Sequence, residues 1–238
     1  RQRQMCIRDR LYRASLPGGA VFLEKNAFTF SYFDKAALDQ LHDKKRKDPE
    51  SVKEAYRTLI DCHALKIKLI KANKKANVST EGKLPTYHNY YLGNDPSKWA
   101  ANVGLFESVI YSNIYKGIDL KVYSQGLHFK YEFLLNAGVS PEAIKLKYEG
   151  ADQLTMKDGN LHILTSINEL VEQAPYAYQM VNGEETEVAC NFKLVGNEMQ
   201  FEFPNGFDSN LPLVIDPVLV GATYTGTVSY THLRAHET

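Results

Sequence analysis

The sequence lacks the long apolar runs and the nucleotide-binding loops on which several protein classes depend. No apolar run among its 238 residues approaches the roughly 18 residues that a helix needs to span a bilayer. No phosphate-binding loop, dinucleotide fingerprint or nucleophile elbow is present either. These absences predict a chain that does not insert directly into a membrane, binds no nucleotide cofactor and is not an enzyme.

Metal-ligating residues are also sparse. The chain has three cysteines and seven histidines, and they do not fall at the spacings of a zinc site. Asp39, His42 and Asp43 lie about one helical turn apart, but they form an incomplete ligand set in a charged segment. We therefore expect no metal and no cofactor. Cys190 is in phase with apolar neighbours and is expected in the core, while its pairing with Cys62 stays open.

Both ends of the chain look foreign to the rest. Residues 4–10 can be encoded by CAG ATG TGT ATA AGA GAC AG, and the reverse complement of that DNA encodes Val-Ser-Tyr-Thr-His-Leu, which is the sequence of residues 228–233. Inverted copies of this kind flank DNA inserts prepared with a transposase. We therefore expect residues 1–10 and 227–238 to be translated sequencing adapters, and residues 11–226 to be a fragment of a longer protein.

No excess of charge is available to attract a polyanion. The chain carries 28 basic and 28 acidic residues, and omitting the two end segments leaves 23 and 26. A formal charge near −3 provides little attraction for nucleic acid or for an anionic membrane. We expect no nucleic-acid partner.

What the sequence does contain is a repeated alternation of apolar and polar residues. Leu65, Ile67 and Leu69 alternate with lysines, and the same period of two recurs further along the chain. The later apolar positions are Leu127, Phe129, Tyr131, Phe133, Ile144, Leu146, Tyr148, Leu161 and Ile163. Asp158-Gly159 and Asn182-Gly183 are dipeptides that favour tight hairpin turns. The pattern predicts an all-β fold of antiparallel sheets packed as a sandwich.

One segment breaks this pattern. Over residues 34–60 the alternation gives way to a charged stretch in which Asp34 can cap a helix that carries Leu38 and Leu41. We predict a small helical insertion there, on the surface of the sandwich.

Turn-rich segments suggest where the chain divides. Residues 73–86 are predicted to be a loop because they combine polar residues with glycine and proline. We predict two sandwich-like subdomains, the first over residues 11–92 and the second over residues 93–226.

The segment from Gly93 to Trp99 has the densest turn signal. The side chains of Asn94 and Asp95 can form hydrogen bonds with their own backbone, and the ring of Pro96 fixes its φ angle. Trp99 can bury a large area beneath the loop. Gly93, Asn94, Asp95 and Pro96 are therefore interpreted as structural. An alternative is a ligand platform, in which Trp99 and three tyrosines present aromatic faces to a carbohydrate. Those tyrosines are Tyr87, Tyr90 and Tyr91.

Carboxylates beside strands are candidates for a second kind of site. Asp119 and Asp216 stand next to a turn or a proline, so we expect both to accept hydrogen bonds from backbone donors. With Glu107 and Glu132 they are also candidates for a glycosidase pair, which needs two carboxyl groups about 5–10 Å apart. The sequence does not show such a distance, and no catalytic residue is assigned.

Several blocks of sequence resemble a known kind of module. They are residues 90–135, YYLGNDPSKWAANVGLFESVIYSNIYKGIDLKVYSQGLHFKYEFLL, with LPGGAVFLEKNAFTF upstream and EQAPYAYQ and LPLVIDP downstream. In this order they resemble the β-rich N-terminal domain of large secreted bacterial proteins. There the domain precedes SBBP-type β-propeller repeats or domains of the gliding-motility-associated, type IX secretion class. The resemblance implies an extracellular or cell-surface location and brings no catalytic residues.

The functional expectation follows from these observations. The chain is expected to be a non-catalytic structural or adhesive module of a large secreted or cell-surface protein. Its partners would be neighbouring domains of the same polypeptide, and a surface glycan or protein. A carbohydrate-binding module and a fragment of a secreted hydrolase are the alternatives.

Overall fold

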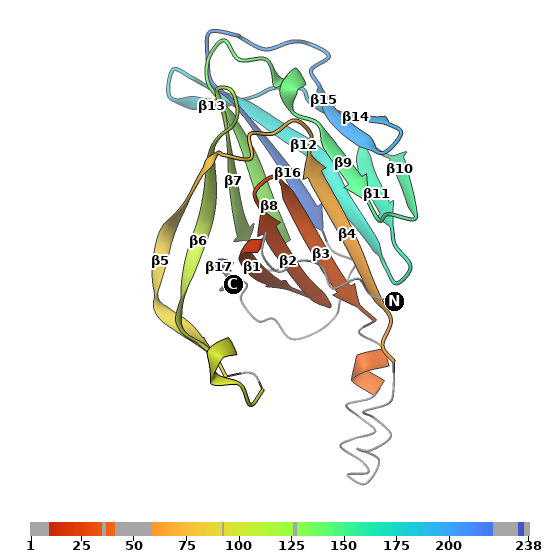
Figure 1. The fold of residues 1–238 in the computed structure, drawn as a ribbon. Coiled ribbons are helices and arrows are strands. Elements are labelled where there is room, and N and C mark those ends of the chain that lie inside the picture. The colour runs from red at the N-terminus through yellow and green to blue at the C-terminus, as the bar shows by residue number, and fades with distance from the viewer. Residues whose placement is uncertain are drawn as a thin grey trace.

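The computed structural model describes residues 10–34, 37–40, 59–91, 93–125, 128–220 and 233–235. Their secondary structure is almost entirely antiparallel β, which confirms the predicted all-β, sandwich-like fold. Hydrogen bonds connect the 17 strands of these residues into one sheet, which is folded into two layers (Figure 1). No helix among these residues is long and apolar enough to cross a membrane.

The first layer contains the N-terminal hairpins (Figure 1). In spatial order its strands are β1 (Arg10–Leu16), β2 (Gly19–Glu24), β3 (Ala27–Phe33), β4 (Cys62–Leu69), β9 (Leu146–Glu149), β15 (Glu198–Glu202) and β14 (Asn191–Val195). Because β9, β15 and β14 come from the second half of the sequence, this layer joins both halves of the chain.

The second layer lies partly behind the first in Figure 1, with β5 and β6 at the left. In spatial order its strands are β5 (Asn77–Tyr90), β6 (Ala100–Tyr115), β7 (Ile118–Gln125), β8 (His128–Leu135), β16 (Leu213–Val220), β12 (Glu169–Val181), β11 (Asn160–Leu164) and β10 (Gln153–Lys157). β13 (Glu184–Glu187) pairs with the far end of β12. The short strand β17 (Leu233–Ala235) pairs with both β1 and β6 and so links the layers.

The core lies between the layers and is rich in aromatic rings. The predicted alternation is confirmed, since Leu65, Ile67 and Leu69 of β4 are all buried while the lysines between them face outward. On β8, Phe129 and Tyr131 are buried in the same way. The ring of Phe28 on β3 lies 5.2 Å from that of Phe129 and 5.6 Å from that of Tyr131, so aromatic contacts join the two layers.

The predicted boundary between residues 92 and 93 does not separate two cores. It falls between β5 and β6, which pair along most of their length. Phe28 and Phe129, one from each predicted subdomain, belong to the same buried cluster. Among the described residues, the two segments therefore share one core.

Two predicted turns are confirmed by their backbone angles. Asp158 and Gly159 have φ of 52° and 78°, and Asn182 and Gly183 have φ of 53° and 86°. Positive φ at both central residues is the requirement of a type I′ turn. These turns join β10 to β11 and β12 to β13.

The loop predicted over residues 73–86 is confirmed for residues 73–76 and wrong from residue 77 onward, because Asn77–Tyr90 forms strand β5. β5 covers little of the core, and most of its side chains are exposed on both faces. It therefore shows no apolar alternation, and its structure comes from its hydrogen bonds to β6. For this reason the sequence of β5 does not alternate between apolar and polar residues as the buried strands do.

The helical insertion is seen in part. Residues 37–40 are helical, and Asp34 caps them, since its Oδ1 accepts a hydrogen bond of 3.1 Å from the backbone N–H of Ala37. Leu38 donates from its backbone to the carbonyl of Asp34. Leu41 and the rest of the predicted insertion up to residue 58 lie outside the described residues, as does Leu127.

Candidate functional site

The free end of the β5–β6 hairpin is built by a capped turn. Asp95 precedes the short 3-10 helix η3 (Pro96–Lys98), and its Oδ1 accepts hydrogen bonds from the backbone N–H and the hydroxyl of Ser97, at 3.1 and 2.7 Å. Gly93 adopts a φ of 73°, which suits a residue without a Cβ. Asp95 thus caps η3 with its side chain.

Trp99 is not buried beneath this turn as predicted. Its side chain is 43% exposed, and its indole N–H donates a hydrogen bond of 3.2 Å to the carbonyl of Gly93. Its ring meets that of Tyr91 edge to face, with centroids 5.5 Å apart and planes at 79°. Tyr91 is 60% exposed. The turn thus holds the indole in place and leaves much of it in contact with solvent.

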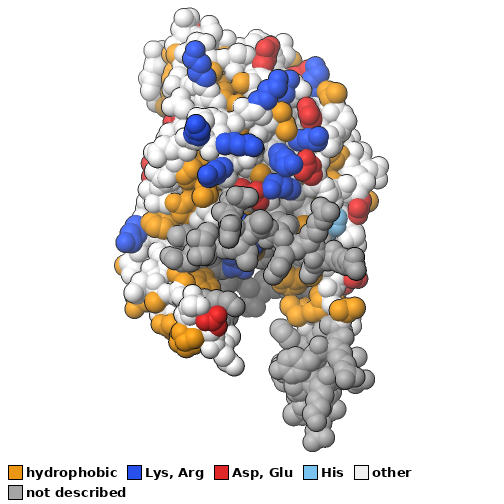
Figure 2. All heavy atoms as spheres, viewed as in Figure 1, with side chains coloured by type: hydrophobic (Ala, Val, Ile, Leu, Met, Phe, Trp, Pro, Cys, Tyr) orange, Lys and Arg blue, Asp and Glu red, His pale blue; other side chains and the backbone are white. Residues whose placement is uncertain are grey.

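The four aromatic residues proposed as a platform do not share one surface. Tyr87 is 58% exposed, whereas Tyr90 is half-buried and its ring stacks on that of His88, with centroids 6.2 Å apart. Residues two apart on a strand share a face, so Tyr90 faces away from Tyr87. We call the exposed residues Tyr87, Tyr91 and Trp99 the aromatic tip. The end of the β5–β6 hairpin lies at the lower left of Figure 1, and Figure 2 shows hydrophobic side chains gathered in that region.

The carboxylates considered as a catalytic pair are only partly brought together. Asp119 of β7 accepts a hydrogen bond of 2.7 Å from the backbone N–H of Asn113 on β6, as expected. Asp216 instead pairs with Lys130 at 2.8 Å, and its side chain is 17% exposed. Glu107 is exposed beside Gly82. Neither Asp119 nor Glu107 joins the surroundings of Asp216.

Glu132 and Asp216 do belong to one cluster on the outer face of the second layer. The hydroxyl of Tyr123 donates to Glu132, and the Lys130 ammonium lies 5.7 Å from the centroid of the Tyr123 ring. Burial, followed by the hydrogen bond to Glu132, raises the pKa of Tyr123. The ammonium group of Lys130 forms an ion pair with Asp216. We therefore interpret this cluster as a surface network of polar contacts rather than a carboxyl pair across a cleft.

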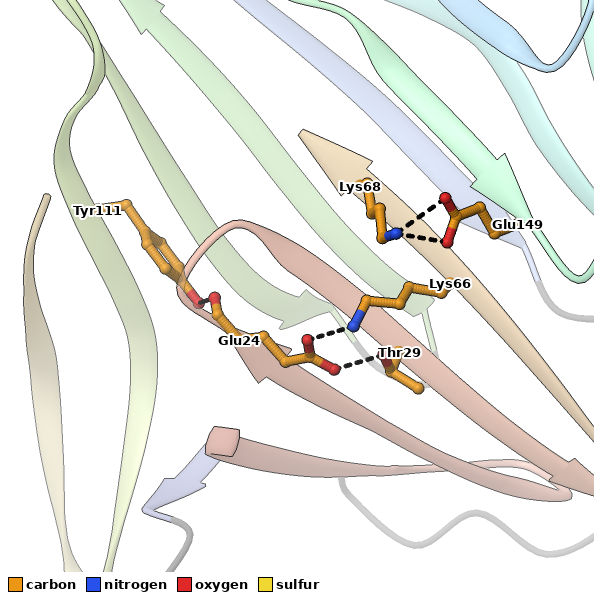
Figure 3. A network of polar contacts seen from close by, with 6 residues as sticks. All are labelled: Glu24, Thr29, Lys66, Lys68, Tyr111 and Glu149. Atoms are coloured by element: carbon orange, nitrogen blue, oxygen red, sulfur yellow. Dashed lines mark hydrogen bonds and ion pairs between the residues drawn. The ribbon is translucent and has the colours of Figure 1, made fainter. Parts of the chain in front are cut away.

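A second polar network connects the two layers (Figure 3). Glu24 lies at the end of β2 and is almost buried, and its carboxylate accepts from the hydroxyl of Thr29 at 2.6 Å and from Lys66 at 2.5 Å. Its backbone carbonyl accepts a hydrogen bond of 2.9 Å from the hydroxyl of Tyr111 on β6. Nearby, Lys68 pairs with Glu149 at the more exposed surface.

Sequence reasoning missed a fully buried carboxyl group. Glu172 of β12 is 0% exposed, and the hydroxyls of Tyr131 and Tyr148 donate to its two oxygens. Desolvation raises the pKa of Glu172, and the two hydrogen bonds partly offset that rise. The position of Glu172 in the strand could have indicated its burial. It lies two residues after the buried Leu170, and residues two apart on a strand share a face.

The two cysteines among the described residues, Cys62 and Cys190, are free thiols. Cys190 is buried, as predicted, and burial raises its pKa to about 12, while Cys62 is exposed. The described residues contain no group of three or more His, Cys, Asp or Glu side chains that could hold a metal ion.

The comparisons with known proteins identify a family. Residues 2–218 match the family described as "Domain of unknown function (DUF7948)". The chain belongs to this family. The match covers nearly all of the two layers, including the aromatic tip and the Glu24 and Glu172 networks. Comparison with curated proteins and with solved structures gave no match.

Proposed function

We propose that the chain is a non-catalytic structural or adhesive module of a larger secreted or cell-surface polypeptide. The observation that carries the proposal is the aromatic tip, in which Tyr87, Tyr91 and Trp99 are 58%, 60% and 43% exposed at the end of a long hairpin. The resemblance of the sequence to N-terminal domains of secreted SBBP-repeat and type IX secretion-class proteins supports the cellular context.

The geometry of the tip favours a protein partner. Exposed tryptophan and tyrosine side chains are enriched among the residues that dominate binding energy at protein interfaces. The planes of Tyr91 and Trp99 stand at 79° to each other, so the two rings form a ridge rather than a flat platform. A ridge fits a pocket on a folded partner, and we take that partner to be a neighbouring domain of the same polypeptide.

Rigidity of the tip supports the same proposal. The hydrogen bond from the indole of Trp99 to Gly93 and the capping of η3 by Asp95 hold the ring before any partner arrives. Pre-organised groups lose less conformational entropy on binding, so more of the contact energy appears as affinity.

A carbohydrate ligand at the tip is the second candidate. Tyr91 and Trp99 both leave ring surface in contact with solvent, next to the exposed carboxylate of Asp95, and such surfaces can stack on sugar rings. This candidate predicts glycan binding that Trp99→Ala abolishes.

The test of the protein-contact proposal uses hydrogen exchange. The source polypeptide, cloned across both ends of this sequence, is compared with the present chain alone. We expect slower amide exchange over residues 87–99 in the longer protein, and loss of that protection in Trp99→Ala. Tyr176→Ala is the matched control, because Tyr176 is 38% exposed on β12 and is not part of the tip. Equal exchange over residues 87–99 in both proteins would contradict the proposal.

A further inference from the structure

A cavity of about 840 Å³ opens at the end of the molecule opposite the aromatic tip. It lies between the 3-10 helix η4 (Pro141–Ala143), the β14–β15 hairpin and the segment that follows β15, in the upper part of Figure 1. Its volume falls within the range of ligand sites, roughly 300–1,000 Å³. The function proposed above does not use it.

One wall of the cavity is aromatic. Phe203 and Phe207, in the segment after β15, are half-buried and meet edge to face with centroids 5.2 Å apart. Phe201 also lines the cavity and is 7% exposed, because it packs on Phe133 of the core. The aromatic wall is therefore continuous with the core, and packing against the core fixes the position of Phe201 in this wall.

The polar lining is balanced in charge. Lys193 of β14 is bound to Glu202 of β15, so these two charges neutralise each other. Lys145 and Glu142 contribute one further charge of each sign. A lining with two cations and two anions does not favour an ion of either sign.

Neutral donors and acceptors complete the lining. Gln200 carries an amide, which both donates and accepts, and Ser140 and Ser209 carry hydroxyls. Ser140 already accepts a hydrogen bond of 3.3 Å from the backbone N–H of Glu142, and its own O–H stays able to donate. Many donors and acceptors beside an aromatic wall match a ligand with hydroxyl groups around its rim and an apolar face.

We propose that this cavity is a binding site for a short neutral oligosaccharide. The apolar face of a sugar ring would pack on Phe203 and Phe207, and its hydroxyls would bind Gln200 and the Lys193–Glu202 pair. The proposal concerns a different site from the aromatic tip and does not depend on the protein contact proposed there.

The segment that carries the aromatic wall is anchored by backbone hydrogen bonds. The N–H of Gly138 donates to the carbonyl of Ser209 at 2.7 Å, and the N–H of Gly206 donates to the carbonyl of Phe203 at 3.0 Å. The first bond joins the segment before η4 to the segment after β15, and the second closes a turn within the aromatic wall.

The experiment is an array of neutral and acidic oligosaccharides, followed by titration calorimetry of the neutral gluco-, xylo- and manno-oligosaccharides that bind. Phe207→Ala should weaken binding about tenfold or more by removing one aromatic contact. Gln200→Ala should weaken it without removing an aromatic side chain, and it serves if Phe207→Ala does not fold. Tyr176→Ala is the matched control and should bind as the parent chain does, because Tyr176 is 38% exposed on β12 and does not line the cavity. Trp99→Ala tests whether the sugar binds at the aromatic tip instead.

Three results would overturn the proposal. The first is an array without neutral ligands, and the second is binding confined to acidic glycans. The third is neutral-glycan binding that Trp99→Ala abolishes while Phe207→Ala and Gln200→Ala retain it, which would place the sugar at the aromatic tip. Circular dichroism and thermal melts of each variant show that it is folded.

Discussion

The hydroxyl of Tyr111, on β6 of the second layer, donates a hydrogen bond of 2.9 Å to the backbone carbonyl of Glu24 on β2 of the first layer. Tyr111 is 1% exposed, so this bond crosses the sandwich inside its core. It joins the two layers at the residue whose side chain also binds Thr29 and Lys66 (Figure 3).

Removing that hydroxyl should destabilise the fold. Tyr111→Phe leaves the ring in place and removes the donor, which should lower the free energy of unfolding by about 1 kcal/mol. Urea denaturation followed by fluorescence measures the change. Tyr87→Phe is the control, because Tyr87 is 58% exposed. This substitution should change the free energy of unfolding by no more than about 0.5 kcal/mol. Equal losses in the two variants would show that the bond across the layers contributes nothing.

Two neighbouring lysines of β4 should differ in importance. Lys66 binds Glu24, whose side chain is only 11% exposed, whereas Lys68 binds Glu149, whose side chain is 37% exposed. Lys66→Met should lower the free energy of unfolding by about 1–3 kcal/mol because it leaves a nearly buried carboxylate without its cation. Lys68→Met should cost about 0–1 kcal/mol because solvent screens its pair. A larger loss for Lys68→Met in urea denaturation would reverse this assignment.

The buried Glu172 should make stability depend on pH. Its pKa is raised in the folded chain above its ordinary value of 4.5, so its protonated form is the one that folding favours. The stabilisation is fully present below pH 4.5 and is lost as the pH rises through the folded-state pKa. Glu172→Gln, which resembles the protonated acid, should therefore gain stability over the parent chain at pH 7, and the gain should shrink towards pH 4.

Thermal melts of the two proteins from pH 4 to pH 8 measure this effect. Glu187→Gln on β13 is the control, because Glu187 is exposed and its replacement should leave the pH profile nearly unchanged. A stability difference between Glu172→Gln and the parent that stays constant with pH would refute the assignment.

The two described cysteines should react at different rates. Burial raises the pKa of Cys190 to about 12, so its thiol stays protonated and inaccessible near pH 8, whereas Cys62 is exposed. N-ethylmaleimide should modify Cys62 in the folded chain and Cys190 only after unfolding in guanidinium chloride. Peptide mapping by mass spectrometry assigns each site. Modification of Cys190 at the rate of Cys62 in the native chain would contradict the burial of Cys190 just before β14.

The sequence predicted the strands that bury one face against the core. Leu65, Ile67 and Leu69 on β4, and Phe129 and Tyr131 on β8, alternate strictly with polar residues, and all five are buried. Paired positive-φ turns at Asp158-Gly159 and Asn182-Gly183 were also readable, because few residue pairs adopt that backbone. These features depend only on residues that are close together in the chain, so they can be predicted from the sequence alone.

The candidate sites were less predictable. The turn at Asp95 was foreseen, but the exposure of Trp99 was not, because nothing in the sequence states whether a core lies beneath that turn. For most of β5 the sequence predicts a loop, because the strand structure of β5 depends on its pairing with β6. The cavity beside Phe207 was missed, since its walls come from four segments between residues 138 and 209.

By itself the sequence determined the all-β class and the inward face of most strands, because the alternation of apolar and polar side chains follows directly from the pleat of a strand. The tertiary structure alone decided that both predicted subdomains share one core and that Glu172 meets Tyr131 and Tyr148 inside it. It also decided that the aromatic tip and the cavity lie at opposite ends. The physical reason is that antiparallel pairing joins segments far apart in the chain, and only the folded layers set which of them meet.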